Sequence, residues 1–253
     1  MRVSIFVFLM AIFLIPIVNS AQINTLSYVT EQYPPYNYKQ NNITKGIAID
    51  ILVEASSQIQ SPIDINNIKV QPWATAYRSA LITPDTVLFS TTRTQIREHI
   101  FQWAGPISQT KIVVLGRKDR NFTINGPLAL AQYRIGVIRD DVGEQLLVEL
   151  GVPRESMIES TVPQKLVHQF ISGELDLWAY EENVAKWWLK ESGQSPEDYE
   201  AVFTLSEGDL YFAFNLGTDR ALVRKLQEGI NQLKLKIDDN GKSRYQVILD
   251  KYR

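Results

Sequence analysis

The stretch VLFSTTRTQIREHIFQWAGP, residues 87–106, is the most informative part of this chain. Its apolar start indicates a buried strand, a polar turn follows, and an aromatic strand begins at residue 101. The turn carries hydroxyls and two guanidinium groups: Ser90, Thr91, Thr92, Arg93, Thr94 and Arg97. An arginine fork matches the two oxygens of a carboxylate, and hydroxyl or N–H donors can satisfy the remaining lone pairs. Because no nucleophile, general base or metal cluster stands beside them in the sequence, the turn indicates a recognition site for a small carboxylate.

Strand and helix patterns alternate on both sides of this stretch. Before it, residues 23–29 predict a strand that is ended by the prolines of the YPPY motif at 33–36, and apolar residues recur at helical spacing over 46–59. Further strands are expected at 101–103, 111–115, 134–138, 200–205 and 209–216, and the last helices at 220–237 and 245–252. This alternation predicts an α/β fold with largely parallel sheets.

The order of these elements predicts two lobes. The second series, about residues 118–203, is too short for the whole sheet, so the last strand and two helices are expected to return to the first unit. We therefore expect lobe 1 to comprise 21–116 plus 206–253 and lobe 2 to comprise 117–205. Ligands of such folds lie at the carboxyl ends of strands, where the polar loops 90–97 and 140–143 would meet.

The first 20 residues predict a secretory signal peptide. A positive Met1-Arg2 start precedes an apolar run and small residues before Ala21. The run covers about 16 residues and contains Pro16, so it is shorter than the roughly 20 that a spanning helix needs. The chain has no Cys, which excludes a thiol nucleophile, a disulfide framework and a lipid-modified cysteine. Export without lipidation predicts a periplasmic protein.

Charge and composition exclude other classes. The formal net charge is −2, and this weak acidity argues against a nucleic-acid partner. The only histidines, His99 and His168, are too few for a metal site. We expect no metal, no cofactor and no catalytic residues.

Several short motifs in order resemble the bacterial extracellular solute-binding proteins of family 3, the amino-acid receptors of ABC importers. They are YPPY at 33–36, GIAID at 46–50, TQIR at 94–97, FQWAGP at 101–106, IGV at 135–137, GELD at 173–176 and FAF at 212–214. The resemblance covers essentially the whole mature chain. It implies the type II periplasmic binding protein fold, with two lobes joined by two hinge crossings. It also implies a monomer that captures a zwitterion by cleft closure and delivers it to a membrane permease.

The resemblance also implies a ligand site. Arg97 matches the arginine that grips the α-carboxylate, and Glu181 matches the acidic residue that pairs with the α-ammonium, with Glu in place of the usual Asp. Tyr33 matches the aromatic residue that lies against the ligand, whereas Tyr36 and Trp73 are expected in the lobe core. The candidate ligand-binding residues are Arg97, Glu181, Thr92, Thr94, Tyr33, Arg93, Asp141, Gly143 and Ser90.

Three positions depart from the family pattern. Arg93 replaces a small or apolar residue, and could hold a second acidic group of the ligand or pair with a carboxylate across the cleft. Thr30, followed by Glu31, stands where the family often has an acidic partner for the ammonium. Asp141 opens a helix whose N-terminus favours an anion, so it would oppose a carboxylate unless it caps the helix.

Two other functions fit the same fold. A sensory module for a signalling partner needs the same cleft as a transport protein. An enzyme resembling cyclohexadienyl dehydratases would need a poised acid or base, for which Glu181 or Glu31 could serve, but no clustered pair of acids is evident in the sequence. The ligand class also stays open: Arg93 beside Arg97 suggests a dicarboxylate, and the Tyr and Trp content equally allows an aromatic or cationic side chain.

Overall fold

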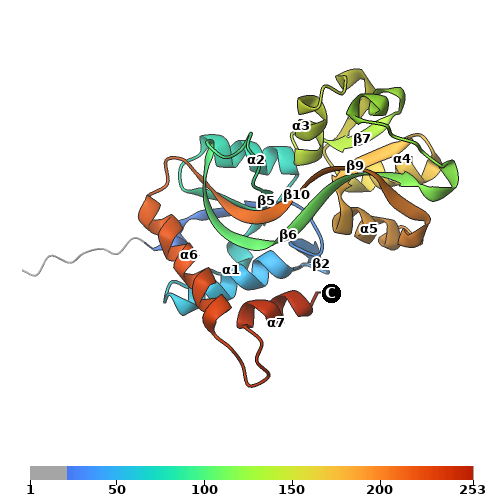
Figure 1. Ribbon diagram of the computed structural model, residues 1–253. Coiled ribbons are helices and arrows are strands. Elements are labelled where there is room, and N and C mark those ends of the chain that lie inside the picture. Colours follow the sequence, from blue (N-terminus) through green and yellow to red (C-terminus); the bar gives the residue numbers. More distant parts are fainter. Residues whose placement is uncertain (1–21, 253) are drawn as a thin grey trace, which may run out of the picture.

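Two strands of 17 residues each, β6 (Phe101–Arg117) and β10 (Tyr199–Asn215), run antiparallel through the computed structural model, which describes residues 22–252. Figure 1 shows them passing side by side from one lobe into the other. Two short strands were expected in place of each. Each strand is instead continuous, because register shifts within their pairing allow the strands to bend without separating. The expected signal peptide lies outside the described residues.

Lobe 1 is built on the parallel strands β4 (Lys69–Val70), β1 (Ser27–Thr30) and β5 (Thr86–Thr92), with β10 antiparallel to β5. A small hairpin, β2 (Tyr38–Gln40) and β3 (Ile43–Lys45), stands apart from this sheet. The helices of the lobe are α1 (Ile47–Gln58), α2 (Trp73–Ile82), α6 (Arg220–Leu235) and α7 (Arg244–Asp250). The chain therefore returns to lobe 1 for its last elements, as the type II fold requires (Figure 1).

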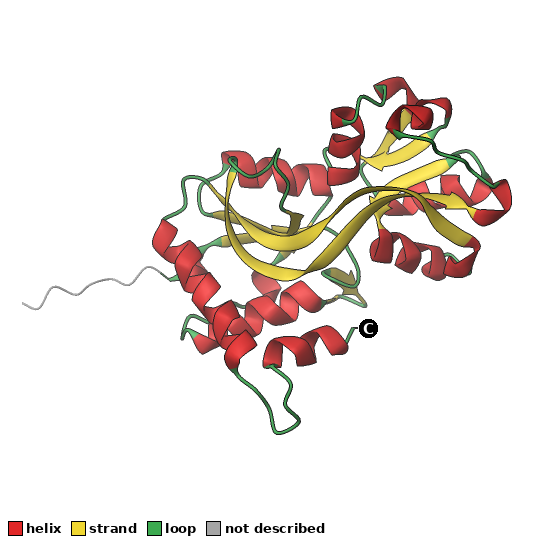
Figure 2. Ribbon diagram, viewed as in Figure 1, coloured by secondary structure: helices red, strands yellow, loops and turns green. Residues whose placement is uncertain are grey.

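Lobe 2 continues the same sheet on the other side of β6. The strands β9 (Leu177–Glu181), β7 (Ile135–Ile138) and β8 (Met157–Ser160) are mutually parallel, and β9 pairs antiparallel with β6. Its helices are α3 (Val142–Glu149), α4 (Pro163–Ser172) and α5 (Glu182–Glu191), which flank the strands in Figure 2. Short 3-10 helices occupy Ile23–Thr25, Ile65–Asn67, Lys118–Arg120, Pro127–Gln132, Arg154–Ser156 and Pro196–Asp198.

β6 and β10 pair with each other along their length, and each also pairs with a strand of a different lobe. Residues 112–116 of β6 pair with β9 of lobe 2, and residues 210–214 of β10 pair with β5 of lobe 1. We take the segments between these pairings as the hinge, and the exact division into lobes stays a prediction. Within residues 22–252, no helix is long and apolar enough to cross a membrane.

The burial of β5 explains why the polar turn after it begins inside the molecule. All seven of its residues are buried, with Val87, Leu88 and Phe89 in the core, so the polar turn that follows starts from inside the molecule.

Close packing of two helices stabilises the same lobe. A Cβ at Gly229 of α6 would lie 2.4 Å from the carbonyl oxygen of Ala55 in α1. Only glycine allows the two helices to approach this closely.

Candidate functional site

Polar residues from both lobes meet at the carboxyl ends of their strands. In lobe 1, Glu31 follows β1, and the turn that carries Arg97 follows β5. In lobe 2, Asp141 follows β7 at the start of α3, and Glu181 ends β9 at the start of α5. The carboxyl ends of strands in open α/β sheets face a crevice, so this placement matches the expected ligand position.

Arg97 is a fully buried cation shared by the two lobes. Its guanidinium carbon lies 5.2 Å from the ring centres of both Trp73 and Tyr77 in α2. It donates hydrogen bonds to two oxygens of lobe 2, Gln145 Oε1 at 2.9 Å and the Asp140 carbonyl at 3.5 Å. The Trp73 indole N–H donates to the same Asp140 carbonyl at 2.8 Å, so α2 and the start of α3 are held together at Arg97.

Three carboxylates are buried in the same region, contrary to the expectation that no acids cluster. Glu31, Asp141 and Glu181 are 5%, 3% and 0% exposed. Burial, followed by the charges of these three carboxylates, raises the pKa values of the Tyr33 and Tyr180 hydroxyls. The acids lie far apart in the chain and in different lobes, which is why the sequence pattern did not reveal them as a group.

The pKa values of the acids reflect their surroundings. Burial raises the pKa of Glu31 well above its ordinary range, the Asp141 charge adds to this, and Arg97 opposes it. Burial likewise raises the pKa of Asp141 to about 6 against the lowering effect of Arg97, and that of Glu181 to about 7 against its hydrogen bonds. Arg97 is the one buried cation among residues 22–252, so it does not fully compensate these charges.

Glu181 differs from the other two acids because its carboxylate oxygens accept several hydrogen bonds from the protein. It caps α5 by accepting from the Val184 N–H at 2.8 Å, and it accepts from the Tyr36 hydroxyl of lobe 1 at 3.1 Å. The Asn183 amide at 3.3 Å and the Lys111 N–H at 3.5 Å complete its partners. Tyr36 was expected in the core, but its hydrogen bond to Glu181 joins the two lobes. The hydrogen bond of Trp73 to the Asp140 carbonyl does the same beside Arg97.

Asp141 and Glu31 have no such partners. Asp141 occupies the N-cap position of α3, but its side chain makes no capping hydrogen bond and its Oδ2 is buried without a partner among the described residues. The N–H groups of Val142 and Gly143 still favour its charged form. The Glu31 carboxylate accepts no hydrogen bond from any residue between 22 and 252, although its backbone carbonyl accepts from the Asn37 amide.

The hydroxyls at the end of β5 and in the following turn are buried, and β5 extends to Thr92, so Ser90, Thr91 and Thr92 belong to the strand and not to the expected turn. Thr92 is 3% exposed and Ser90 is 5% exposed. Within the described chain, the side-chain oxygens of Ser90, Thr91 and Thr94 are buried without a hydrogen-bond partner. Buried hydroxyls are normally paired, so this turn retains unused hydrogen-bonding capacity.

Arg93 forms a local ion pair in place of a pair across the cleft, and its role as a ligand contact stays a prediction. Its guanidinium forms a bidentate pair with Glu98, five residues further along the turn, at 2.6 and 2.7 Å. It also lies over the rings of Trp103 and Tyr211, at 5.6 and 5.2 Å from their centres. The pair is more than one-third exposed, so Arg93 stabilises the outer side of the turn and faces no acid across the cleft.

Gly143 has a packing role. A Cβ at this position would lie 3.0 Å from the Ala179 carbonyl oxygen of β9. Its small size therefore lets the first turn of α3, which carries Asp141 and Gln145, approach the neighbouring strand. Gln145 itself was missed from the sequence, although it lies four residues after Asp141 on the same face of α3.

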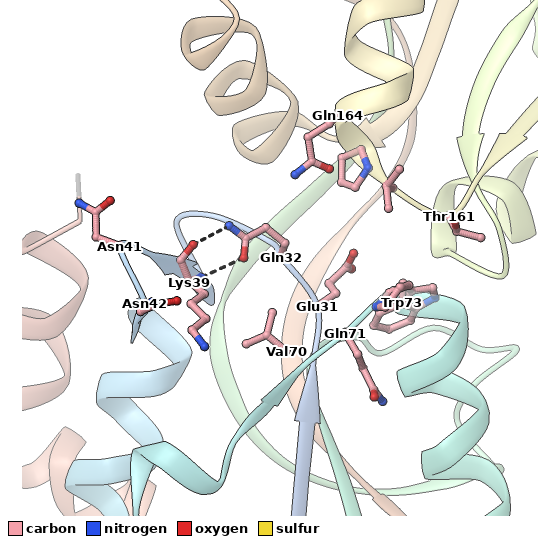
Figure 3. Close-up of a pocket in the computed structure, with 13 residues that line it drawn as sticks. Glu31, Gln32, Lys39, Asn41, Asn42, Val70, Gln71, Trp73, Thr161 and Gln164 are labelled. Carbon is pink, nitrogen blue, oxygen red and sulfur yellow. Dashed lines mark hydrogen bonds between the residues drawn. The ribbon is translucent and has the colours of Figure 1, made fainter.

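A cavity of about 590 Å³ opens between the lobes beside this region. Figure 3 shows Glu31 pointing into it, with Trp73 nearby and Thr161 and Gln164 on the lobe 2 side. Its lining is rich in amides and comprises Glu31, Gln32, Lys39, Asn41, Asn42, Val70, Gln71, Pro72, Trp73, Thr161, Val162, Pro163 and Gln164. Glu31 and Trp73 thus connect the buried charges with an accessible cavity.

The two-lobed sheet and the inter-lobe site agree with a match to the family described as bacterial extracellular solute-binding proteins, family 3, over residues 26–252. The chain belongs to this family. No match was found among curated protein sequences. The family description assigns a solute-binding role.

Three solved structures illustrate the likeness in fold. A histidine kinase sensor domain similar to periplasmic binding proteins has a TM-score of 0.77 at 16% identity, covering 91% of this chain and 96% of that chain. An ancestral arginine-binding protein bound to arginine has a TM-score of 0.73 at 17% identity, covering 91% and 99%. The amino acid ABC transporter substrate-binding protein AbpA from Streptococcus pneumoniae, bound to L-arginine, has a TM-score of 0.70 at 15% identity, covering 89% and 93%. At these identities the likeness establishes the fold.

Proposed function

We propose that this family 3 solute-binding protein captures an amino acid in the periplasm between its two lobes and delivers it to an ABC importer. The observation that carries the proposal is a pair of fully buried, opposite charges contributed by different lobes, Arg97 and Glu181. The transporter-associated protein among the structural neighbours supports the same function.

In this proposal the ligand carboxylate pairs with Arg97. Its two oxygens take the place of Gln145 Oε1 and the Asp140 carbonyl as acceptors. The hydroxyls of Ser90 and Thr92 at the end of β5, and of Thr94 in the turn that follows, are further donors. The ligand ammonium lies beside Glu181 and against the ring of Tyr33. Because the zwitterion bridges the lobes, it interacts more strongly with the closed than with the open arrangement and shifts the population toward closure.

Calorimetric titration of the protein lacking residues 1–20 against the twenty amino acids tests this function. We expect at least one amino acid to bind, and Glu181→Gln to weaken it more than it weakens the matched acid that lacks the α-amino group. Equal losses for both ligands would remove Glu181 as the ammonium partner. Binding of no amino acid would contradict the proposed function.

A sensory function is the second candidate, because one structural neighbour is a histidine kinase sensor domain. Uptake of the labelled ligand by cells with and without the gene distinguishes the two. Loss of uptake supports delivery to an importer. Intact uptake with loss of a ligand-dependent transcriptional response supports sensing.

A further inference from the structure

A second cavity, of about 600 Å³, lies between the two lobes. Its walls come from α5 of lobe 2 and from α7 and the YPPY loop of lobe 1, and residues 108–109 of β6 line it where the strand passes between the lobes. In Figure 1, α5 and α7 lie on the same side of β6. The second cavity shares no lining residue with the cavity that Glu31 lines, so the two are distinct.

The charged residues that line the second cavity are cationic. Lys186 and Lys190 line it from successive turns of α5. Asn183 and Trp187 also line it, and their spacing from the lysines places all four on one face of the helix. Lys186 pairs with Glu182 at 2.6 Å, whereas Lys190 is exposed and forms no ion pair within residues 22–252. Because no acid of the described chain lines the cavity, its charge favours an anion.

Two acids next to the lining are already paired with other groups. Asp50 accepts a hydrogen bond from the Tyr252 hydroxyl at 3.0 Å and pairs with Lys251 at 2.7 Å. Glu182, besides its pair with Lys186, has a carboxylate oxygen 3.8 Å from the ammonium of Lys111. Neither acid pairs with Lys190, so the charge of this lysine stays available to a ligand.

An aromatic and apolar surface adjoins the lysines. Trp187 is half-buried and packs against Trp188 and Tyr38, with ring centres 4.8 and 6.0 Å from its own. The opposite wall, from lobe 1, is formed by Pro35, Tyr36, Ile47, Leu249 and Tyr252. The Trp187 indole N–H and the Ser108 hydroxyl form no hydrogen bond within the described chain, so both can donate to a ligand. The lining therefore suits an apolar body that carries acceptor atoms.

We infer that the second cavity binds a small aromatic carboxylate. The carboxylate pairs with Lys190 and lies near Lys186, and the aromatic body lies between Trp187 and the wall of lobe 1. The volume of the cavity is within the range of roughly 300–1,000 Å³ that is typical of small-molecule sites. Because this ligand contacts both lobes, it binds more tightly when the lobes are together, and it acts as an effector of closure.

The second site goes beyond the proposed function, because its ligand is not the transported amino acid. Tyr36 connects the two sites: it lines the second cavity, and its hydroxyl donates to Glu181, the proposed ammonium partner, at 3.1 Å. When two ligands favour the same arrangement of the lobes, each raises the affinity of the protein for the other by the same factor. This coupling rests on the proposed function, whereas the second site itself does not.

Indole-3-acetate and indole-3-acetamide are matched probes, since they have nearly the same shape and differ by one negative charge. Calorimetric titration of the protein lacking residues 1–20 compares them at low ionic strength. We expect the acetate to bind about tenfold more tightly than the amide, because hydrogen bonds to charged groups are stronger than those to neutral groups. Added salt should weaken binding of the acetate and leave that of the amide unchanged, because it screens the exposed charge.

Three variants locate the probes. Lys190→Gln changes an exposed side chain, so it should fold, and it should reduce the preference for the acetate to about threefold or less. Trp187→Leu should weaken both probes to a similar extent, because it removes the aromatic surface that both contact. Lys236→Gln, the same change at an exposed lysine after α6, should leave both affinities unchanged. Thermal unfolding checks that each variant folds, and Lys190→Gln remains a sufficient test if Trp187→Leu does not.

Arg97→Lys distinguishes the second site from the amino-acid cleft, because Arg97 can also hold a carboxylate. This variant should leave the affinity for indole-3-acetate unchanged. Loss of acetate binding in Arg97→Lys but not in Lys190→Gln would place the probe in the amino-acid cleft and overturn the inference. Equal binding of the two probes to the wild type, or binding of neither, would overturn it as well.

The coupling is tested last, with an amino acid that the protein binds. Saturating indole-3-acetate should raise the affinity for this amino acid in the wild type and not in Lys190→Gln. An unchanged affinity in the wild type would overturn the effector role. Binding of no amino acid would contradict the proposed function, and the titrations with the two indole probes would still decide whether the second site exists.

Discussion

Arg97 holds its charge inside the protein by being surrounded with acceptors and aromatic faces. It donates to Gln145 Oε1 and lies between Trp73 and Tyr77. Lysine keeps the charge but lacks the planar fork and the stacking surface. Arg97→Lys should therefore fold with its cleft charge intact, and lose about 100-fold or more in affinity for the amino-acid ligand. Calorimetric titration measures the loss.

Arg93→Lys is the matched control for this prediction. Arg93 belongs to the same turn, but it pairs with Glu98 at a partly exposed position. Exposed pairs contribute about 1 kcal/mol or less, so this variant should retain ligand affinity and nearly the same stability. Equal losses of affinity in both variants would mean that the turn as a whole, and not the Arg97 fork, determines binding.

Among residues, single candidate side chains could be predicted from the sequence more readily than the residues that they contact in the fold. Arg97 could be identified because strand end, hydroxyls and arginine are adjacent in the chain. Glu31 and Asp141 were considered separately, because 110 residues divide them and their proximity depends on how the lobes meet. The local pair of Arg93 with Glu98 was not predicted, because it has no more distinctive sequence pattern than a ligand contact. The ligand-binding roles of all these residues stay predictions.

The first turn of α3 depends on how closely the helix approaches β9. Gly143→Ala would place a Cβ 3.0 Å from the Ala179 carbonyl oxygen, so α3 or β9 must shift by a few tenths of an ångström. Such overpacking should lower the free energy of unfolding by about 1–3 kcal/mol. It should also weaken ligand binding, because the same turn positions Asp141 and Gln145. Chemical denaturation and titration check the two effects.

Gly208→Ala in β10 is the control for Gly143→Ala, since a Cβ there has no atom within 4 Å. It should change the free energy of unfolding by less than about 0.5 kcal/mol. If Gly143→Ala were equally mild, α3 would have room to shift, and the assigned packing role of Gly143 would be wrong.

Among the elements, alternation and periodicity predicted the α/β class and most helices, and the family resemblance implied the type II fold. The bounds of α1, expected at 46–59 and found at Ile47–Gln58, follow from its apolar spacing. The continuity of β6 and β10 was not predictable, because polar and glycine-containing segments interrupt their apolar pattern. Pairing between the two long strands holds these segments extended, and pairing partners distant in sequence do not appear in a local pattern.

At the scale of the whole molecule, the proposed closure brings like charges together. With the lobes in contact, burial raises the pKa of Asp141 from 3.8 to about 6, and that of Glu181 from 4.5 to about 7. A carboxyl whose pKa is raised in the closed arrangement is neutral in both the open and the closed arrangement at low pH. Below its ordinary pKa it therefore does not destabilise the closed arrangement. As the pH rises from the ordinary to the raised pKa, the carboxyl ionises first in the open arrangement, where solvent reaches it. Each pH unit in this window destabilises the closed arrangement relative to the open one by about 1.4 kcal/mol for each such carboxyl.

The protein without ligand should therefore be closed near pH 4 and open progressively by about pH 7. The groups that face Asp141 in the closed cleft are Glu31, Arg97, Glu144, Tyr33 and Tyr180. Small-angle X-ray scattering should show a radius of gyration that increases over this range.

Asp141→Asn separates this effect from other titrations. His99 and His168 are exposed, and they are present in wild type and variant alike. Because asparagine is neutral throughout, the variant should remain closed to higher pH, and its radius of gyration should change less between pH 4 and 7. A wild-type radius that is constant with pH, or that increases on acidification, would contradict the control of closure by these acids. An identical profile in wild type and Asp141→Asn would assign the effect to Glu31 and Glu181 instead.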